Sequence, residues 1–353
     1  MHAAATLATP APASAFDRVP GYLAACTAGL PTRETVDAMR SAVDVWAAGR
    51  LDASEAGAQL ERCRALFATI ARVDPAQVAT GSQASQLVSV IATAVPDGAE
   101  VLCVEQDFAS LTHPFEQLSG RGVRVRYAPL DSLAEEIGPD TALVAFSAVQ
   151  SASGAVADVD AICAAAARAG ALTLADLTQS LGWLPVGADR FDFTVCHAYK
   201  WLCAPRGVAF LTVRAGLEDR LTPLAAGWYS ADDVWSSCYA GHTPLAVGAG
   251  RFDVSPAWQA VAGTEPALRL FAELDPRAAH AHAIALSHAA SDALELPRRD
   301  SAILTWSDPE GADLAAMRAH GIVASGRAGN ARVAFHLWNT LEDVDMLAEA
   351  LRR

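Results

Sequence analysis

The sequence predicts a mainly parallel α/β protein with a seven-stranded sheet and a smaller C-terminal α+β domain. Two observations predict this class. Short β-rich runs alternate with helical stretches over residues 78–213, and from about residue 245 the chain turns to alanine-rich helices with two further strand candidates. Such alternation is typical of a parallel sheet covered by helices. The length of 353 residues is enough for about two domains.

Each element follows from a local pattern. Helices are expected over 31–49 and 54–72, because apolar residues recur there at helical spacing. The seven strand candidates are VAT near 78, VLCV at 101, VRVRY at 123, ALVAFS at 142, LTLAD at 172, FTVC at 193 and VAFLTV at 208. Helical stretches such as SQLVSVIATAV and DVDAICAAAARAG lie between most of them. The last run follows the sixth closely enough to form an antiparallel hairpin.

The expected domain boundaries follow from the same patterns. Residues 1–20 are rich in alanine and proline and are expected to be a flexible tail. The large domain is expected over 21–245. The small C-terminal domain is expected over 246–353, with strands in SAILTWS at 301 and ARVAFHLW at 331.

Composition narrows the class of partner. The chain has 26 basic and 40 acidic residues and a net charge of −14, which argues against nucleic acid and anionic membrane surfaces and favours a small-molecule ligand. No apolar run is long enough to span a membrane. The seven cysteines form neither a CxxC pair nor a zinc spacing, so reduced thiols in a cytoplasmic protein are expected, without a metal site.

Lys200 is the only lysine among the 26 basic residues. Arginine replaces lysine on a solvated surface, but it cannot lose its proton to act as an amine nucleophile. If the protein uses amine chemistry, Lys200 performs it. The alternative is a surface lysine that escaped a codon bias towards arginine, and its setting between an apolar strand and WLCAPRG argues against that.

Polar and aromatic residues follow four of the predicted strands, where ligands bind in open α/β sheets. These residues are Ser82 and Gln83 in TGSQAS, Phe108 in EQDFAS, Asp176 and Gln179 in ADLTQS, and His197, Tyr199 and Lys200 in HAYK. They match the needs of pyridoxal 5′-phosphate: a lysine for the aldehyde, a carboxylate for the ring nitrogen, an aromatic face and helix amides for the phosphate. Individually, Asp176 could cap a helix and His197 could be a core residue.

From Tyr22 to near the end, the chain resembles the class V aminotransferase superfamily of pyridoxal-phosphate enzymes of fold type I. That group includes cysteine desulfurases, kynureninases, isopenicillin-epimerase-like enzymes and carbon–sulfur lyases. The motifs that carry the resemblance are YLAACTAGLP, TGSQAS, EQDFAS, ADLTQSLG, HAYKWLCAPRGVAFL and RVAFHLWNTLEDVD.

The resemblance implies a role for each candidate residue. Lys200 would form the aldimine, Asp176 would pair with the pyridine nitrogen, Gln179 would contact the phenolic oxygen and Phe108 would cover the ring. The residues expected around the phosphate are Ser82, Gln83, His197 and Tyr199. Arg332 would bind the substrate α-carboxylate.

Two kynureninase-like segments imply a second subunit. They contain Trp228, in GWY, and Ser255, in FDVSP. The resemblance implies that these segments reach the cofactor phosphate of the neighbouring subunit, which predicts a homodimer with shared active sites.

The departures from relatives bear on the reaction. No cysteine follows Cys238, whereas cysteine desulfurases carry a sulfur-accepting cysteine in their C-terminal part. Kynureninases have histidine where this chain has Gln179. We therefore expect an amino acid to be processed through an external aldimine and a quinonoid, most simply by β-elimination of the carbon–sulfur lyase type. The alternative reactions are transamination and epimerisation. The alternative without enzymatic activity is that the protein is a catalytically silent dimeric homologue.

Overall fold

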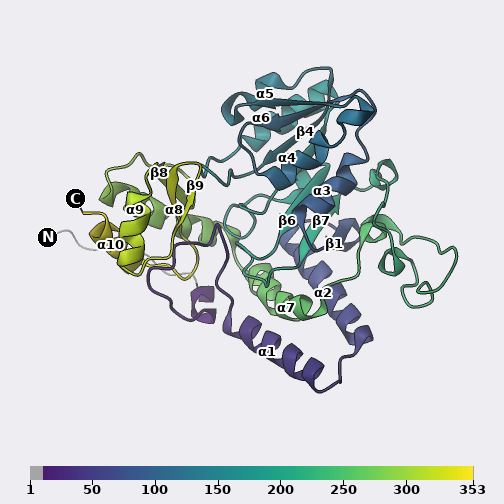
Figure 1. Cartoon of the computed structure of the whole chain (residues 1–353), viewed down its shortest axis with the longest axis horizontal. Helices are drawn as coiled ribbons and strands as arrows, with labels where there is room; N and C mark the ends of the chain where they lie inside the picture. The colour runs from purple at the N-terminus through teal and green to yellow at the C-terminus, as the bar shows by residue number, and fades with distance from the viewer. Residues whose placement is uncertain (1–10, 353) are drawn as a thin grey trace.

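The computed structural model describes residues 11–352, and it has the predicted class. A seven-stranded, mostly parallel sheet forms one body, and a three-stranded sheet with its own helices lies beside it (Figure 1). Residues 1–10 of the predicted tail lie outside the described residues. From Ala11 on, the chain forms a 3₁₀ helix, η1 (Ala11–Ala15), and then buries Phe16.

The large sheet contains every strand that the sequence predicts for it. Its strands are β1 (Val78–Gly81), β2 (Glu100–Val104), β3 (Arg124–Ala128), β4 (Thr141–Ser147), β5 (Leu172–Asp176), β6 (Phe193–His197) and β7 (Ala209–Val213). They lie in the order β1-β7-β6-β5-β4-β2-β3. β7 is antiparallel to β6, which confirms the predicted hairpin, and β1 is antiparallel to β7. Two reversals restore the direction of β1, so its carboxyl end lies at the same edge as those of the parallel strands.

Ten α-helices are found among residues 11–352. They are α1 (Arg33–Ala47), α2 (Ala53–Ala71), α3 (Ala84–Ala92), α4 (Ala109–Glu116), α5 (Leu133–Glu136), α6 (Val159–Ala169), α7 (Trp258–Glu273), α8 (Pro276–Ala293), α9 (Ala312–Ala319) and α10 (Leu341–Ala350). The first begins where its Thr32 side chain accepts a hydrogen bond from the Thr35 backbone, and the second is capped in the same way by Asp52. Both agree with the helices predicted over 31–49 and 54–72.

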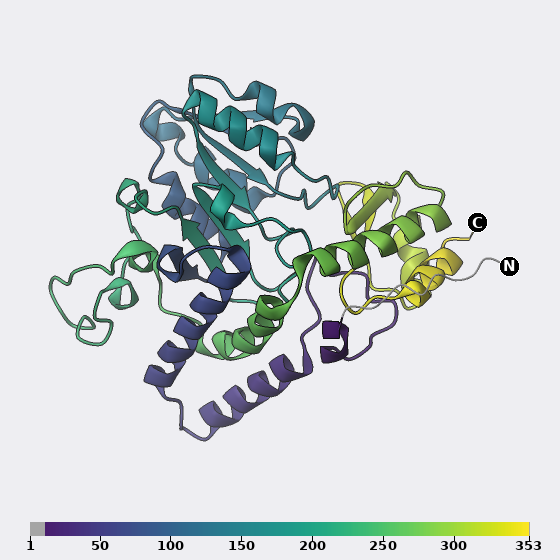
Figure 2. The same ribbon diagram turned by 180° about the vertical axis from the view of Figure 1, so that it is seen from behind.

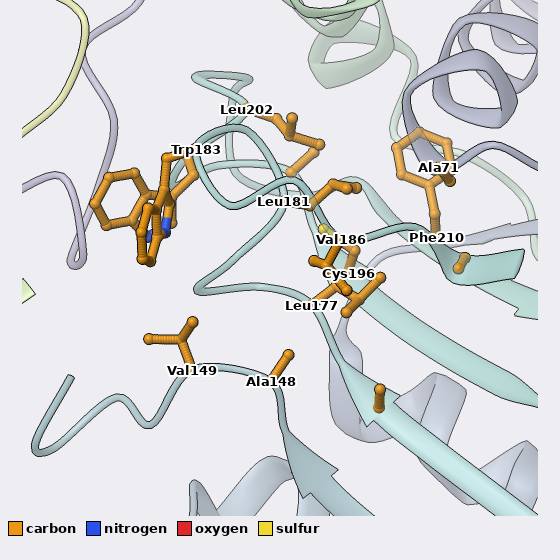
Figure 3. Close-up of a cluster of buried hydrophobic side chains, with 14 of the residues drawn as sticks. Ala71, Ala148, Val149, Leu177, Leu181, Trp183, Val186, Cys196, Leu202 and Phe210 are labelled. Atoms are coloured by element: carbon orange, nitrogen blue, oxygen red, sulfur yellow. The ribbon is translucent and has the colours of Figure 1, made fainter. Parts of the chain in front are cut away.

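The side chains of alternate strand residues pack into two hydrophobic layers, one on each face of the large sheet. Leu102 packs into the layer that includes α2 and α6, whereas its neighbour Val101 packs into the layer that includes α3 and α4. Figure 3 shows part of the first layer, where Phe210 and Cys196 from the strands lie on the side of Ala71 of α2. Both faces of the large sheet are therefore covered by packed side chains.

The small sheet consists of β8 (Ile303–Ser307), β10 (Asn330–Ala334) and β9 (Ser325–Arg327), in that order and all antiparallel. It agrees with the strands expected near 301 and 331 and adds the short β9. Isolated bridges join Tyr22 to Val323 and Ala24 to Ala334. The two bodies are therefore tied together by the segment that precedes α1, and α8 spans the side seen in Figure 2. The predicted boundary at residue 245 stays a prediction.

A buried ion pair fixes the start of the sheet to a distant segment. Arg64 of α2 donates from Nη2 to Asp253 Oδ2 at 2.6 Å, and both side chains are more than nine-tenths buried. Asp253 Oδ1 also accepts from the backbone N–H and the hydroxyl of Thr80, at 2.6 and 3.0 Å. The carboxylate thereby holds the end of β1 immediately before the loop that carries Ser82 and Gln83.

Removing this carboxylate is expected to destabilise the fold strongly. Asp253→Ala leaves the buried Arg64 guanidinium without its anion, so the free energy of unfolding should fall by about 3–5 kcal/mol in urea denaturation. The matched control is Glu61→Gln, because Glu61 is the largely exposed second partner of Arg64. Its loss should cost at most about 1 kcal/mol. Equal effects of the two changes would contradict this account of the pair.

Candidate active site

A cavity of about 130 Å³ lies at the carboxyl edge of the large sheet. Six of the predicted site residues line it, together with Lys200. The lining consists of Gln83, Ala84, Phe108, Ser110, Ser147, Ser151, Asp176, Thr178, Gln179, His197, Tyr199, Lys200 and Arg206. These residues come from loops after β1, β2, β4, β5 and β6. The strand direction therefore gathers side chains that are more than a hundred positions apart in sequence.

Lys200 is almost fully buried in this cavity. Desolvation lowers the pKa of its amine to about 8, although the nearby Asp176 carboxylate opposes the shift. Its Nζ lies 5.4 Å from the centre of the Phe108 ring and 5.7 Å from that of Tyr199. The amine is thus held between aromatic faces and is uncharged more readily than an ordinary lysine.

The N-terminal segment supports the backbone of Lys200. The Gly29 N–H donates to the Tyr199 carbonyl at 2.9 Å. A Cβ on Gly29 would lie 2.1 Å from the Lys200 carbonyl oxygen, so only glycine permits this approach. The motif YLAACTAGLP therefore packs directly on the loop that carries the lysine.

Asp176 is the buried carboxylate of the cavity. One of its oxygens accepts from the Thr178 backbone N–H at 2.8 Å, and burial raises the pKa of the carboxyl group. The Thr178 hydroxyl in turn accepts from the His197 backbone N–H at 3.0 Å, which links the ends of β5 and β6. A cation placed against Asp176 would restore the ionised form that burial disfavours.

Unused hydrogen-bonding groups gather at the other end of the cavity. Both ring nitrogens of His197 are buried without a partner among residues 11–352. Its pKa is lowered to about 4 by burial and by the charges of Arg206 and Lys200, so the ring is neutral at pH 7. Helix α3 begins at the cavity wall, and its N-cap residue Gln83 makes no side-chain cap. The Arg206 guanidinium lies 5.2 Å from the Tyr199 ring centre.

Such a donor set fits a phosphate group. The first amides of a helix and its dipole bind anions, and a neutral histidine can donate one hydrogen bond. Arg206 adds a full positive charge. The unpartnered nitrogens of His197 are the sign that this end of the cavity is built for a ligand, because buried polar atoms normally have partners.

Phe108 stands at the cavity wall with nearly half of its surface exposed. The preceding residue, Asp107, accepts from the Ser147 backbone N–H at 2.8 Å, from its hydroxyl at 2.5 Å and from the Gln150 amide at 3.1 Å. These bonds hold the loop after β2 against β4. The aromatic ring is therefore positioned beside Lys200 by hydrogen bonds rather than by core packing.

Arg332, on β10 of the small sheet, is almost fully buried and reaches towards the large sheet. Its guanidinium donates to the Ser151 carbonyl, to the Ser151 hydroxyl at 3.0 Å, to Thr27 Oγ1 at 3.2 Å and to Ser325 Oγ at 3.1 Å. All of these acceptors are neutral. Among residues 11–352 the buried guanidinium thus has only neutral acceptors, and it is suited to receive an anion.

The Gln179 side chain is already engaged by the protein. Its Nε2 donates to the Cys26 carbonyl at 2.9 Å and to the Ser151 hydroxyl at 3.1 Å, and its Oε1 accepts from the Trp201 indole at 2.8 Å. Ser151 thus connects Gln179 with Arg332. The predicted contact between Gln179 and a cofactor oxygen stays a prediction.

Three predicted residues lie elsewhere. Ser82 and Ser255 line a separate, very small cavity, and Ser82 donates from its backbone to Gln86 Oε1 at 3.2 Å. Trp228 packs against Tyr229 and Trp235. The chain between β7 and α7, which contains these residues, is drawn in green on the right of Figure 1. Within one chain these three residues are not brought to the Lys200 cavity.

The sequence analysis missed several cavity residues. Arg206 lies inside the quoted HAYKWLCAPRG motif, but arginine accounts for all but one of the basic residues, so its identity carried no signal. Ser147 ends a predicted strand and Ser151 follows it, so the rule that selected Asp176 would have selected both of them too. Thr178 lies between two predicted residues.

This fold and cavity define an α/β enzyme that works with a lysine amine and an anionic cofactor at the end of a parallel sheet. The chain belongs to the class-V aminotransferase family, whose model matches residues 39–322. Family membership confirms the predicted superfamily, the enzymatic class and the cofactor, pyridoxal 5′-phosphate.

Individual relatives span almost the whole chain. It is 27% identical over 310 residues to the uncharacterized aminotransferase YcbU of Bacillus subtilis (strain 168), which covers 82% of each chain. It is 26% identical over 386 residues to isopenicillin N epimerase of Streptomyces clavuligerus, which covers 97% of this chain and 92% of the relative. The structure of the cystine C–S lyase C-DES with cysteine persulfide has a TM-score of 0.84 at 18% identity, covering 94% and 97% of the two chains. That likeness supports the fold.

The described part of the chain also bears on metals and membranes. Among residues 11–352, no three histidine, cysteine or acidic side chains gather as a metal site. Within the same range, no helix combines the length and the apolar character of a membrane span.

The lowered pKa of Lys200 predicts how the cofactor-free protein takes up its cofactor. Only the uncharged amine attacks the aldehyde, and the uncharged fraction rises with pH through a pKa of about 8. The rate of covalent uptake, followed by stopped-flow absorbance, should therefore rise with pH, reach half of its maximum near pH 8 and level off about one to two pH units higher. Lys200→Arg should abolish uptake at every pH. A midpoint near that of free lysine would contradict the desolvation argument.

Proposed function

We propose that the protein catalyses β-elimination from a cysteine-like amino acid, with release of the sulfur group, in a carbon–sulfur lyase reaction. One observation carries the proposal: a buried lysine base stands in a cavity that no cysteine among residues 11–352 lines. No cysteine follows Cys238 in the sequence either. Cys26 is the thiol that acts on the charges of Lys200 and Arg332, but it is buried and lies outside the cavity lining. Sulfur removed from a substrate would therefore meet no thiol from the described part of the chain at the cavity wall and would leave as a free product.

The side chains around the cavity suit the parts of the cofactor. Lys200 would hold it covalently, and Asp176 would face the ring nitrogen. His197, Tyr199, Gln83 and the start of α3 would bind the phosphate, with Arg206 as a counter-charge. Phe108 would cover the ring. When bound, pyridoxal phosphate supplies an electron sink that acidifies the substrate Cα–H bond.

Lys200 acts as base and then as acid in this reaction. Its amine, with a pKa lowered to about 8, accepts the proton when the Cα–H bond breaks. The electron pair forms the Cα–Cβ double bond while the Cβ–S bond breaks, and sulfur leaves with its own pair. The Lys200 ammonium returns the proton to the sulfur. The released enamine hydrolyses to a 2-oxo acid and ammonia. Arg332 would hold the α-carboxylate and orient the Cα–H bond towards Lys200.

The relatives support this choice without deciding it. C-DES is a cystine C–S lyase, whereas YcbU is called an aminotransferase and the Streptomyces clavuligerus enzyme is an epimerase. All three reactions begin with a proton taken from Cα. They differ in the next step, which depends on the leaving group at Cβ and on where the proton returns.

A product assay distinguishes these outcomes. The holoenzyme incubated with L-cysteine and L-cystine should release pyruvate and ammonia in equal amounts, together with sulfide or persulfide. Lys200→Ala should lose at least about a thousandfold in rate, since base and covalent anchor go together. Amino transfer to an added 2-oxo acid would replace the proposal with transamination. Inversion of Cα without pyruvate would replace it with epimerisation.

We further propose that the active unit is a homodimer in which each subunit completes the phosphate site of the other. Trp228 and Ser255 lie away from the Lys200 cavity of their own chain. The segment that contains Trp228 exposes Leu224, Trp235 and Tyr239, the last of them fully, and a second subunit would cover such apolar surface.

Mixing two inactive variants tests the shared site. Lys200→Ala and Ser255→Asp each spoil one side of the predicted site, the second by placing a carboxylate near the phosphate. Random re-pairing of subunits gives mixed dimers with one intact site, so about a quarter of the wild-type activity should return. Mixing either variant with itself is the control. Absence of recovery in confirmed mixed dimers would mean that each chain builds its site alone.

A further inference from the structure

The cavity region carries an excess of positive charge in a chain whose net charge is −14. Lys200 and Arg206 line the cavity, and Arg332 reaches it through Ser151. Arg327 adds a fourth cation from the small sheet. Among residues 11–352, the only carboxylate in the cavity lining is that of Asp176. The positive charge at this edge of the sheet therefore favours anionic ligands.

The proposed function uses three of these four cations. Lys200 anchors the cofactor, Arg206 lies on Tyr199 at the phosphate end, and Arg332 is placed for the substrate α-carboxylate. No part of the cofactor or of a simple amino acid calls for Arg327.

The backbone holds Arg327 on the same side of the small sheet as Arg332. In the antiparallel pair of β9 and β10, Arg332 lies opposite Ser325, and Arg327 lies opposite Asn330. Residues two apart on a strand share a face, so Arg327 is on the Ser325 face. Ser325 Oγ accepts from Arg332 Nε at 3.1 Å. Arg332, Ser325 and Arg327 therefore lie on the same face of the small sheet.

A tight turn fixes this placement. β9 and β10 are joined by two residues, Ala328 and Gly329, with φ of 49° and 75°. Positive φ at both positions is typical of the two-residue hairpin turn that matches strand twist. The turn follows Arg327 directly, so the position of its Cα is set by the hairpin.

The Arg327 side chain is available to a ligand. It is exposed, and its guanidinium donates to the carbonyl of the adjacent Gly326, at 2.7 Å. The ion pairs found among residues 11–352 do not include Arg327. The charge of Arg327 also acts on the cavity region. Burial is the main cause that lowers the pKa of Lys200 and of Arg332, and the positive charge of Arg327 is a smaller cause of the same sign.

We propose that Arg327 binds a second anionic group on the substrate, so that the enzyme selects amino acids with an acidic side chain. Arg332 takes the α-carboxylate of the substrate. Arg327 lies two strand positions from Ser325, the residue that accepts from Arg332, and takes a carboxylate or similar anion at the far end of the substrate side chain. This inference rests on the proposed assignment of Arg332 and deepens the proposed function. In the preferred substrate, the sulfur group that leaves, or the part of the side chain beyond the sulfur, would carry the negative charge.

Ligand binding without turnover tests the inference independently of the reaction. Calorimetry on the holoenzyme compares the diacids succinate, glutarate and adipate with their half-amides, which have the same shape but one charge fewer. At least one diacid should bind about threefold to tenfold tighter than its half-amide. Arg327→Gln should remove that difference. Arg332→Gln should weaken both members of each pair.

Arg318→Gln is the matched control, because Arg318 is an exposed arginine on α9 of the same small body and is not among the causes that shift the pKa of Lys200 or Arg332. It should keep the wild-type preference. Equal binding of diacid and half-amide by the wild type, or a preference that survives Arg327→Gln, would overturn the inference. A preference lost in Arg206→Gln but kept in Arg327→Gln would move the second anion to the other end of the cavity. Failure of pyruvate release with an intact diacid preference would overturn the elimination reaction alone.

Discussion

The active site depends on burying the amine of a single lysine. A charged ammonium in this setting is costly, and the pKa of Lys200 falls to about 8 as a result. The surroundings keep the residue functional rather than inert. Asp176 supplies a compensating negative charge, and the aromatic rings of Phe108 and Tyr199 flank the amine. The backbone contact of Gly29 holds the loop on which it stands.

The direction of the strands determines which residues can meet Lys200. Four parallel pairs and two antiparallel ones leave the carboxyl ends of β1, β2, β4, β5 and β6 at one edge. Loops at that edge supply the carboxylate, the aromatic ring and the helix amides. The Arg64 and Asp253 pair fixes the end of β1 from the interior. Ser151 joins Gln179 to Arg332 and so connects the large sheet to the small one.

Local sequence patterns were enough to predict most of the fold and part of the candidate site. The strands of the large sheet were predictable because each is a short apolar run between helical segments. Lys200 could be singled out because it is the only lysine in the sequence, and Asp176 could be singled out because it ends a predicted strand. Arg206 and Arg327 could not be distinguished from the other arginines, since nothing in their neighbours reveals which of them lacks an acidic partner. The short strand β9 has only three residues, too few for a periodic signal.

The sequence by itself determined the family and the cofactor and singled out Lys200 as the candidate lysine, because the chemistry of an aldehyde cofactor requires residue types that cannot be exchanged. Tertiary structure alone decided which side chains share a cavity. It separated Ser82, Ser255 and Trp228 from Lys200 and added Arg206 and Ser151. It also placed Arg332 and Arg327 on the same face of one hairpin. The physical reason is that charge balance and desolvation depend on distances between segments that are remote in the chain, and no local pattern records those distances.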